Sequence, residues 1–555
     1  CAQNTEISVN GCIVNDPAKI ANQFNQYFHS VFTRGDHADT NIISLSTISA
    51  DFITVEGVLS MLLNVEYKYS DGPDGIPNAF SQRYAEPIAH VFTHIFRLSF
   101  HNSILPDDWR TARVIPVFKK GDRLNVENYR PLSLTSGPCK LLEHIITHYV
   151  MSFLEENSIL TPFQHGFRKG LSTTTPLVTT IHDFAMAIDK GDQIDAIFWD
   201  FRKAFDCVWH SKLLTELSNI DLPITVINWI RSYLTSREQF VQVEGCGSGV
   251  LPVTSGVPQG SVLGPVLFLI FINDIVSSVD TSAISLKLFA DDCILYKPIK
   301  SERDQECLQN NLNFLSDWCH TWSMELNISK SVRMRISNKI TPFASRYTLN
   351  NNSLIEVSNF KYLGVNIVNR LSWSNHIDDA CSSASRKLGF LRHKVKNAPT
   401  QIKLLAYNTF IRPRLEYACV AWDPYFKKDV YKLEMVQRRA VRFIYNAYHN
   451  LDSPSSLMAI NIPLLKQRRT IARLKFLFLL RNHQFNINLS KYISPSSSRK
   501  TRHAHNHDLT PYFARTNLFK HSFFPRTISE WNALPSNVFP ERGIPDFENH
   551  MHLFV

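Results

Sequence analysis

Long apolar runs and paired cysteines are both missing from this sequence of 555 residues. No stretch reaches 18 apolar residues, so we expect no membrane-spanning helix; the run Val266–Ile272 is far too short. None of the ten Cys residues lies in a Cys-x-x-Cys pair, and no signal peptide follows Cys1. We therefore expect free thiols in a reducing compartment, and a fragment whose upstream part is missing.

The composition also lacks the bias of a disordered or collagen-like chain. Hydrophobic residues make up 44%, charged residues 19% and aromatic residues 12% of the sequence. A chain of this length and composition can bury several cores, and we expect three or four domains or subdomains.

Positive charge is unevenly distributed along the chain. Residues 1–375 hold 31 Lys and Arg against 37 Asp and Glu, a net charge of −6. Residues 376–555 hold 28 against 12, a net charge of +16. A basic segment interleaved with aromatic residues favours binding to a phosphate backbone, and the alternative is a solvated helical surface.

Three aspartates stand at the ends of apolar segments. Asp291 and Asp292 interrupt the apolar stretch Leu286–Tyr296, which we predict to be a strand–turn–strand hairpin. Asp200 follows Ile194–Trp199, a predicted buried strand. Adjacent carboxylates repel one another unless a cation is present, and oxygen ligands suit magnesium. The pattern fits two-metal phosphoryl transfer, although a lone Asp-Asp pair is more often an ordinary turn.

Other segments predict the surroundings of these carboxylates. We expect helices over 85–100 and through Ala204, Val208 and Leu213, a strand over 110–119, and a buried helix over 262–272. The segment Gly256-Val-Pro-Gln-Gly-Ser261 precedes that last helix. Its glycines permit close approach of a flat partner, and Gln259 offers a donor and an acceptor.

The order of these segments resembles the reverse transcriptase of non-LTR (LINE-type) retrotransposons, specifically the jockey/CR1-like group. The segments that carry the resemblance are Ser70–Pro77, Asn128–Leu134, Gln164–Arg168, Asp200–Asp206, Gly256–Ser261, Phe289–Asp292, Leu326–Lys330, Phe360–Val365, Arg412–Tyr417, Gln437–Arg442 and Phe524–Asn532. Together they cover nearly the whole chain in the order typical of the family.

The resemblance implies a catalytic centre with two Mg²⁺ ions, for which Mn²⁺ could substitute. Asp200 and Asp291 would be metal ligands, together with the backbone carbonyl of Phe201. Asp292 would be a looser or primer-side ligand. Lys330 would protonate the leaving pyrophosphate.

The resemblance also implies a deoxynucleotide site. Lys119 and Arg130 would hold the triphosphate. Phe205 would be a steric gate against the ribose 2′-hydroxyl, or only a buried aromatic residue. Gln259, next to Gly260, would contact the nascent base pair.

Template and primer would be held by further segments. Arg168 is a candidate template contact or a structural arginine. Tyr362, Leu363 and Gly364 belong to the hairpin that resembles the family's primer grip. Three arginines resemble the family's thumb and are candidates for phosphate binding: Arg438, Arg439 and Arg442.

We therefore predict an α+β right-hand polymerase that copies an RNA template onto a DNA primer with deoxynucleoside triphosphates. The predicted parts are an N-terminal lead-in (1–50), fingers and palm with a small antiparallel sheet (51–375), a helical thumb (376–455) and a basic C-terminal region (456–555). We expect no membrane partner, action in the nucleus on genomic DNA and a cytoplasmic ribonucleoprotein stage. The alternative is a decayed transposon copy that binds nucleic acid without polymerising.

Overall fold

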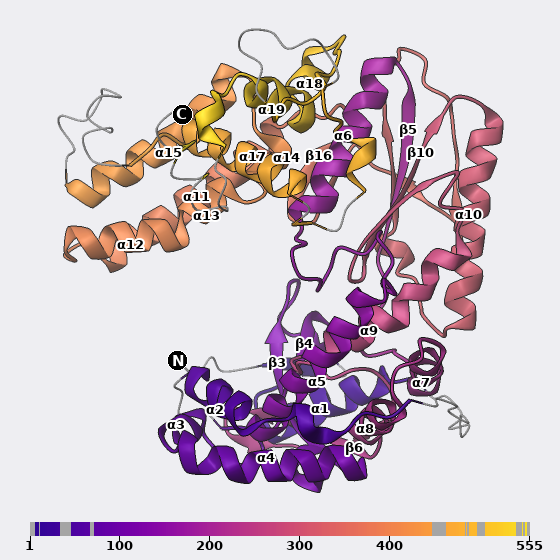
Figure 1. Ribbon diagram of the computed structural model, residues 1–555, viewed down its shortest axis with the longest axis vertical. Helices are drawn as coiled ribbons and strands as arrows, with labels where there is room; N and C mark the ends of the chain where they lie inside the picture. The colour runs from indigo at the N-terminus through magenta and orange to yellow at the C-terminus, as the bar shows by residue number, and fades with distance from the viewer. Residues whose placement is uncertain are drawn as a thin grey trace. The chain divides into compact units, whose positions relative to one another are not determined.

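The computed structural model describes residues 6–9, 11–33, 46–66, 71–446, 462–482, 484, 485, 488–496, 506–539, 547, 550 and 551, so Ser70 lies outside the described residues. The chain forms two compact units, each assembled from separate stretches (Figure 1). Unit 1 consists of Cys1–Thr161, Phe201–Val279 and Asn313–Asn327. Unit 2 consists of Pro162–Asp200, Asp280–Leu312 and Ile328–Val555. The predicted boundaries at residues 50, 375 and 455 remain predictions.

Unit 1 is built on a sheet in the order β4-β3-β6-β7, with β8 also paired to β6. Its strands are β3 (Thr111–Phe118), β4 (Tyr129–Leu134), β6 (Arg237–Val243), β7 (Cys246–Gly247) and β8 (Leu251–Val253). Helix α1 (Pro17–Ser30) packs on β6 through Ile20, Phe24 and Phe28. Alternating burial along β3 and β6 gives these strands one buried face, and the helix packs on its apolar residues Val114, Val241 and Val243.

The remaining helices of unit 1 pack mainly on one another. They are α2 (Val55–Asn64), α3 (Asn78–Arg83), α4 (Ala85–Asn102), α5 (Gly137–Glu156), α7 (His210–Asn219), α8 (Ile224–Leu234) and α9 (Gly264–Asn273). Helix α4 confirms the helix predicted over 85–100, and α9 is buried along most of its length, as predicted for 262–272. Short strands β1 (Ile7–Val9) and β2 (Cys12–Val14) form a hairpin.

Unit 2 contains a five-stranded sheet in the order β14-β11-β5-β10-β9. Its strands are β5 (Gln193–Trp199), β9 (Ser285–Phe289), β10 (Asp292–Ile299), β11 (Val332–Ile336) and β14 (Ile355–Glu356). Only β11 and β14 run parallel, so the sheet is mainly antiparallel, as predicted. Every residue of β5 is buried, which fits its central place, and α6 (Thr174–Lys190) packs against it (Figure 1).

Helices and small hairpins follow this sheet within unit 2. They are α11 (Ser374–Lys394), α12 (Thr400–Phe410), α13 (Arg412–Glu416), α14 (Cys419–Trp422), α15 (Lys427–Tyr445), α17 (Leu465–Arg481), α18 (Asn517–Lys520) and α19 (Phe523–Asn532), with hairpins β12 (Thr348–Leu349)–β13 (Asn352–Ser353) and β15 (Asn359–Tyr362)–β16 (Val365–Val368). Helix α10 (Glu302–Thr321) runs from unit 2 into unit 1.

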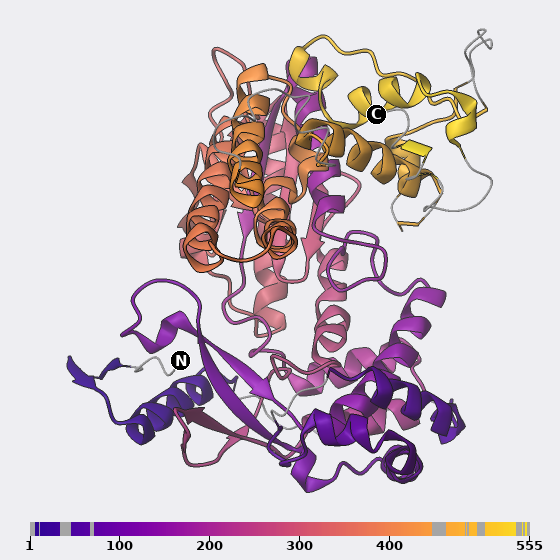
Figure 2. The ribbon, with the colours of Figure 1, turned by 90° about the vertical axis from the view of Figure 1, so that its left-hand side faces the viewer.

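One hydrophobic core joins the sheet of unit 2 to these helices. It extends from Phe198 in β5 through Trp422 in α14 to Trp531 in α19. The α11–α15 group, drawn in orange in Figure 2, therefore shares its core with the palm-like sheet and the C-terminal helices. Among the described residues every cysteine is free, and no helix combines the length and apolar character that a bilayer span requires.

The helix predicted through Ala204, Val208 and Leu213 is wrong in its first part, and only Leu213 lies in a helix, α7. The chain turns repeatedly after Asp200, and regular helix begins only at His210. The carbonyl of Phe205 accepts from the Val257 amide at 2.8 Å, and that of Val208 accepts from the Gly256 amide at 2.8 Å. Carbonyls that bond to another segment are not used for i to i+4 helical bonds, so tertiary contacts override the helical pattern here.

Candidate active site

The predicted acidic hairpin and the end of β5 meet at one edge of the unit 2 sheet. Asp292 pairs with Phe289, so Ala290 and Asp291 form a two-residue turn. On the other side of β10, Cys293 pairs with Trp199. One step further along this antiparallel register, Asp292 falls opposite Asp200. The fold thus brings all three predicted carboxylates to the same end of adjacent strands.

The turn that carries Asp291 is held in a strained conformation by a buried amide. Ala290 has φ +55°, which costs energy for a residue with a side chain. Gln164 is 1% exposed, and its Oε1 accepts from the amides of Ala290 at 2.9 Å and Gly166 at 2.8 Å. A Cβ at Gly166 would lie 2.5 Å from the Ala290 nitrogen. Gln164 and Gly166 therefore fix the position of the turn.

The segment that contains Gln164 also runs alongside β9. The amide of His165 donates to the Leu288 carbonyl at 2.8 Å, and the Leu288 amide donates to the Phe163 carbonyl at 2.9 Å. Burial lowers the pKa of His165 to about 3, so its ring is neutral near pH 7. Sequence reasoning assigned no role to Gln164, although it belongs to the segment Gln164–Arg168 that carries the family resemblance.

Lys330 lies with the carboxylates, as predicted. Its Nζ is 2.5 Å from Oδ2 of Asp200, and the Asp200 side chain is 24% exposed. Among the residues that the structure describes, no group of three or more His, Cys, Asp or Glu side chains is arranged to hold a metal ion. The donors still have the chemistry that magnesium takes, namely carboxylate oxygens at a solvent-accessible edge. The Lys330 ammonium neutralises the Asp200 carboxylate in this structure. A bound cation would be stabilised by the same carboxylate.

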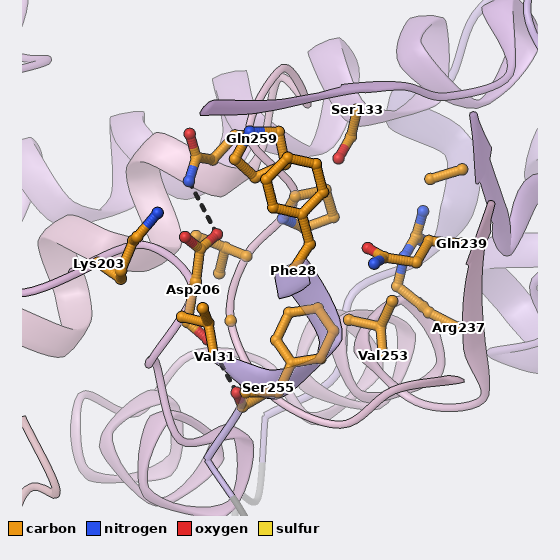
Figure 3. Close-up of a pocket in the computed structure, with 16 residues that line it drawn as sticks. Phe28, Val31, Ser133, Lys203, Asp206, Arg237, Gln239, Val253, Ser255 and Gln259 are labelled. Atoms are coloured by element: carbon orange, nitrogen blue, oxygen red, sulfur yellow. Dashed lines mark hydrogen bonds between the residues drawn. The ribbon is translucent and has the colours of Figure 1, made fainter. Parts of the chain in front are cut away.

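The predicted nucleotide residues lie in unit 1. Nε2 of Gln259 donates to Oδ1 of Asp206 at 2.8 Å. Both residues line one side of a narrow cavity, which Phe28 and Arg237 also line (Figure 3). The backbone around Gln259 is anchored as well, since its carbonyl accepts from the Ser133 amide at 2.7 Å. Asp206 is the residue that sequence reasoning missed here, although it closes the segment Asp200–Asp206.

The two glycines that flank Gln259 allow this close packing. Gly256 has φ +84°, and a Cβ there would lie 2.7 Å from the Asp206 carbonyl oxygen. Gly260 has φ +118°, and a Cβ there would lie 2.7 Å from the Ser133 carbonyl oxygen. The close approach predicted from the glycines is therefore an approach to the chain's own backbone.

Phe205, Lys119 and Arg130 have different surroundings. The ring of Phe205 is half-buried and stacks on Phe268 with centroids 4.4 Å apart, a contact that fits the packing alternative. Lys119 and Arg130 are exposed on the β3–β4 hairpin, where the Lys119 amide donates to the Asn128 carbonyl at 2.8 Å. Their exposure leaves both side chains accessible to a ligand.

The predicted primer and template residues are mostly buried. Tyr362 and Leu363 are 3% and 8% exposed, so their side chains belong to the core. Gly364 is exposed at the turn of the β15–β16 hairpin, and the Tyr417 hydroxyl donates to the Leu363 carbonyl at 3.0 Å. Of these three predicted residues, Gly364 is therefore the one whose backbone is accessible to nucleic acid.

Arg168 and the thumb arginines also differ from one another. Arg168 is 5% exposed, which favours the structural alternative over a template contact. Arg439 is exposed on α15, whereas Arg438 and Arg442 on the same helix are half-buried. Phosphate contacts from this helix are therefore most accessible at Arg439.

Comparisons with known proteins agree with this geometry. Residues 117–367 match the family model "Reverse transcriptase (RNA-dependent DNA polymerase)", a range that includes every predicted catalytic and nucleotide-binding residue. The "Probable RNA-directed DNA polymerase from transposon BS" of Drosophila melanogaster is 26% identical over 85% of this chain and 54% of its own length. The "RNA-directed DNA polymerase from mobile element jockey" of Drosophila melanogaster is 25% identical over 78% of this chain and 47% of its own length.

Over these ranges the chain is similar to the jockey-like non-LTR reverse transcriptases. The jockey polymerase of Drosophila funebris is 27% identical over 77% of this chain and 48% of its own length. The chain thus spans about half the length of the curated relatives it matches. A solved structure of apo telomerase from Candida tropicalis matches 52% of this chain and 59% of its own chain. The sequence identity is 12% and the TM-score is 0.35.

The reverse-transcriptase match of residues 117–367 confirms the predicted fold class, the α+β right-hand polymerase. Reverse transcriptases generally use divalent metal ions, so a cation at the Asp200–Asp292 edge agrees with the family. The alternative of a decayed copy is not favoured, because Asp200, Gln259, Asp291 and Lys330 are all present.

Gln164→Met should lower kcat for single-nucleotide addition by about 10²-fold, because the strained turn would lose its main acceptor and shift. Met keeps the length of the side chain but cannot accept from Ala290. Gln309→Met is a matched control outside the three carboxylates. The side-chain amide of Gln309 also bonds the backbone, since it accepts from the Thr348 amide and donates to the Thr348 carbonyl. An unchanged kcat in Gln164→Met would show that the hydrogen bond between Gln164 and the Ala290 amide does not position Asp291.

The pH dependence of stability tests the surroundings of Asp206. Burial raises the pKa of this carboxyl from 3.8 to about 6, against the opposing hydrogen bond from Gln259. The native state then keeps a proton that the unfolded state releases, so stability falls as pH rises from about 4 to about 6, by roughly 3 kcal/mol. Asp206→Asn should lose this decrease, as measured by thermal unfolding at several pH values. Equal pH slopes in both proteins would contradict the burial argument.

Proposed function

We propose that this chain is an RNA-directed DNA polymerase that extends a DNA primer on an RNA template with deoxynucleoside triphosphates. The observation that carries the proposal is the register that places Asp200 opposite Asp292, next to the Asp291 turn. Carboxylates from neighbouring strands at one sheet edge are what phosphoryl transfer between a 3′-hydroxyl and a triphosphate requires. The family match of residues 117–367 supports the same reaction.

The three carboxylates and Lys330 would perform the chemistry. Asp200, Asp291 and the backbone carbonyl of Phe201 would hold the divalent ions, Mg²⁺ or Mn²⁺, with Asp292 as a looser ligand. Bound magnesium would supply charge neutralisation for the triphosphate and activation of the 3′-hydroxyl. Lys330, now paired with Asp200, would donate a proton to the departing pyrophosphate.

The residues of unit 1 would select and orient the nucleotide. Lys119 and Arg130 would bind the triphosphate, as a point charge and as a bidentate donor respectively. Gln259, held by Asp206 and followed by Gly260, would contact the nascent base pair. Phe205 would exclude the ribose 2′-hydroxyl, provided that its ring can leave or share the stack on Phe268.

Duplex binding is proposed for the basic last third of the chain. Arg438, Arg439 and Arg442 on α15 would contact phosphates. Outside this third, the turn at Tyr362–Gly364 would add a further contact, and Arg168 would do so only if its buried side chain became accessible. We also propose that the protein acts in the nucleus on genomic DNA, after a cytoplasmic ribonucleoprotein stage, as the family resemblance implies.

A primer-extension assay tests the proposed function. The full chain is incubated with oligo(dT) annealed to poly(rA), thymidine triphosphate and Mg²⁺. We expect stepwise extension that stops on chelation with EDTA and resumes when Mg²⁺ is restored. A chain that binds primer–template but adds no nucleotide with Mg²⁺ or Mn²⁺ would support the decayed-copy alternative instead.

A further inference from the structure

A large cavity lies within unit 2, and the proposed polymerase chemistry makes no use of it. It has a volume of about 750 Å³. One wall is a single face of α15, along which lining residues recur at spacings of three and four. The other walls come from the start of α17, the segment 511–514, the end of α18 and α19. All of these elements belong to the same shared core, so the cavity is built into one unit.

The cavity presents more available positive charge than negative charge. Lys427, Lys466 and Lys520 line it and are exposed. Its two carboxylates are already engaged. Glu434 accepts from the Lys466 backbone amide at 2.8 Å, and Glu530 lies 2.8 Å from Arg473 and 3.1 Å from Arg526. An anionic ligand would therefore meet ammonium groups rather than carboxylates that need a partner.

Aromatic rings line the same cavity. Tyr425 and His521 stack with centroids 4.6 Å apart and planes at 12°. Burial and the neighbouring Arg526 lower the pKa of His521, so it stacks as a neutral ring at pH 7. Tyr431 is 57% exposed on the α15 wall. Rings beside exposed lysines are the two components with which proteins hold unpaired nucleotides.

We infer that this cavity binds an unpaired stretch of a nucleic-acid strand, with phosphates at the lysines and a base stacked on Tyr431 or on the Tyr425–His521 pair. The inference rests on the proposed function, since it assumes that the protein handles nucleic acid. It adds a site for single strands to the duplex contacts proposed for α15. A duplex would satisfy the lysines, but its paired bases could not reach the rings.

Binding of short oligonucleotides to the full chain tests this inference. The probes are fluorescein-labelled oligo(rU) and oligo(dT) of about 12 nucleotides, and a duplex of the same length, within the range that single-strand sites cover. Fluorescence anisotropy is measured at several salt concentrations. Comparison of oligo(rU) with oligo(dT) identifies whether RNA or DNA supplies the strand.

Two variants and two matched controls separate the components. Tyr431→Ala should weaken single-strand binding about tenfold or more and leave duplex binding unchanged. Phe513→Ala is its control, because Phe513 is 83% exposed and does not line the cavity. The double variant Lys427→Ala/Lys520→Ala should reduce the salt slope of single-strand binding by about 1.4. Lys428→Ala is its control, an exposed lysine on α15 outside the cavity.

Several outcomes would overturn the inference. One is single-strand affinity that is the same in Tyr431→Ala as in Phe513→Ala. Another is loss of duplex binding as large as the loss of single-strand binding. A third is a polyglutamate peptide that competes with oligo(rU) and is insensitive to Tyr431→Ala, which would assign the cavity to an acidic protein segment. Primer extension is scored separately, so failure of the polymerase and failure of this site remain distinguishable.

Discussion

Asp291→Asn should lower the rate of magnesium-dependent primer extension by at least ~10³-fold. The turn places this carboxylate at the edge where Asp200 and Asp292 also end, and an amide cannot neutralise a divalent ion there. Because Asn has nearly the same size, the hairpin and the hold of Gln164 on Ala290 should persist. Single-turnover extension at saturating primer–template measures the effect.

A matched control is Asp280→Asn, a substitution of an exposed carboxylate before β9 in the same unit. It should leave the rate within about twofold, since Asn keeps the Oδ1 atom that accepts from Ser282 and the substitution leaves the three carboxylates intact. Asp292→Asn should cause a smaller loss than Asp291→Asn, in keeping with a looser ligand. Retained activity in Asp291→Asn would remove the metal assignment altogether.

Primer–template affinity should fall about 10³-fold when salt is raised from about 50 to about 200 mM, if roughly six phosphates are neutralised. The net charge of +16 over residues 376–555 motivates this expectation. Changing Arg438, Arg439 and Arg442 to Gln should reduce the slope of log affinity against log salt by up to about 2.7. A binding titration at three or more salt concentrations measures both slopes.

Arg303→Gln is the control for this series, because Arg303 is exposed on α10, outside the basic third. It should leave the salt slope unchanged. A flat salt dependence in the unmodified chain would mean that the basic surface only keeps the protein soluble. A steep slope that the three α15 substitutions do not alter would place the phosphate contacts elsewhere in residues 376–555.

The strands that carry the carboxylates could be predicted because their apolar runs are short and end at charged residues. Buried strands such as β5 produce that pattern directly, and β9 and β10 confirm it. The segment after Asp200 could not be predicted in the same way. Its carbonyls bond to residues 255–257, a contact between parts of the chain that no local window of sequence contains.

The net charge of residues 376–555 also overstates how many basic side chains are accessible to a ligand. Arg469 and Arg473 are 0% and 1% exposed, because both pair with the buried carboxylate of Asp423. These arginines count toward the charge of +16 but hold α14 and α17 together rather than facing a ligand. The sequence has no signal that separates them from Arg439, since burial depends on how the helices pack.

The place of β5 in its sheet has a consequence during synthesis on the ribosome. Its partners are β10 and β11, which begin at Asp292 and Val332, roughly a hundred residues downstream of Trp199. At translation rates of about 5–20 residues per second, β5 waits on the order of 5–20 seconds with both edges unpaired. A mostly apolar strand in that state is prone to associate with neighbouring chains. Production of this protein should therefore depend on chaperones that cover the nascent chain until β10 emerges.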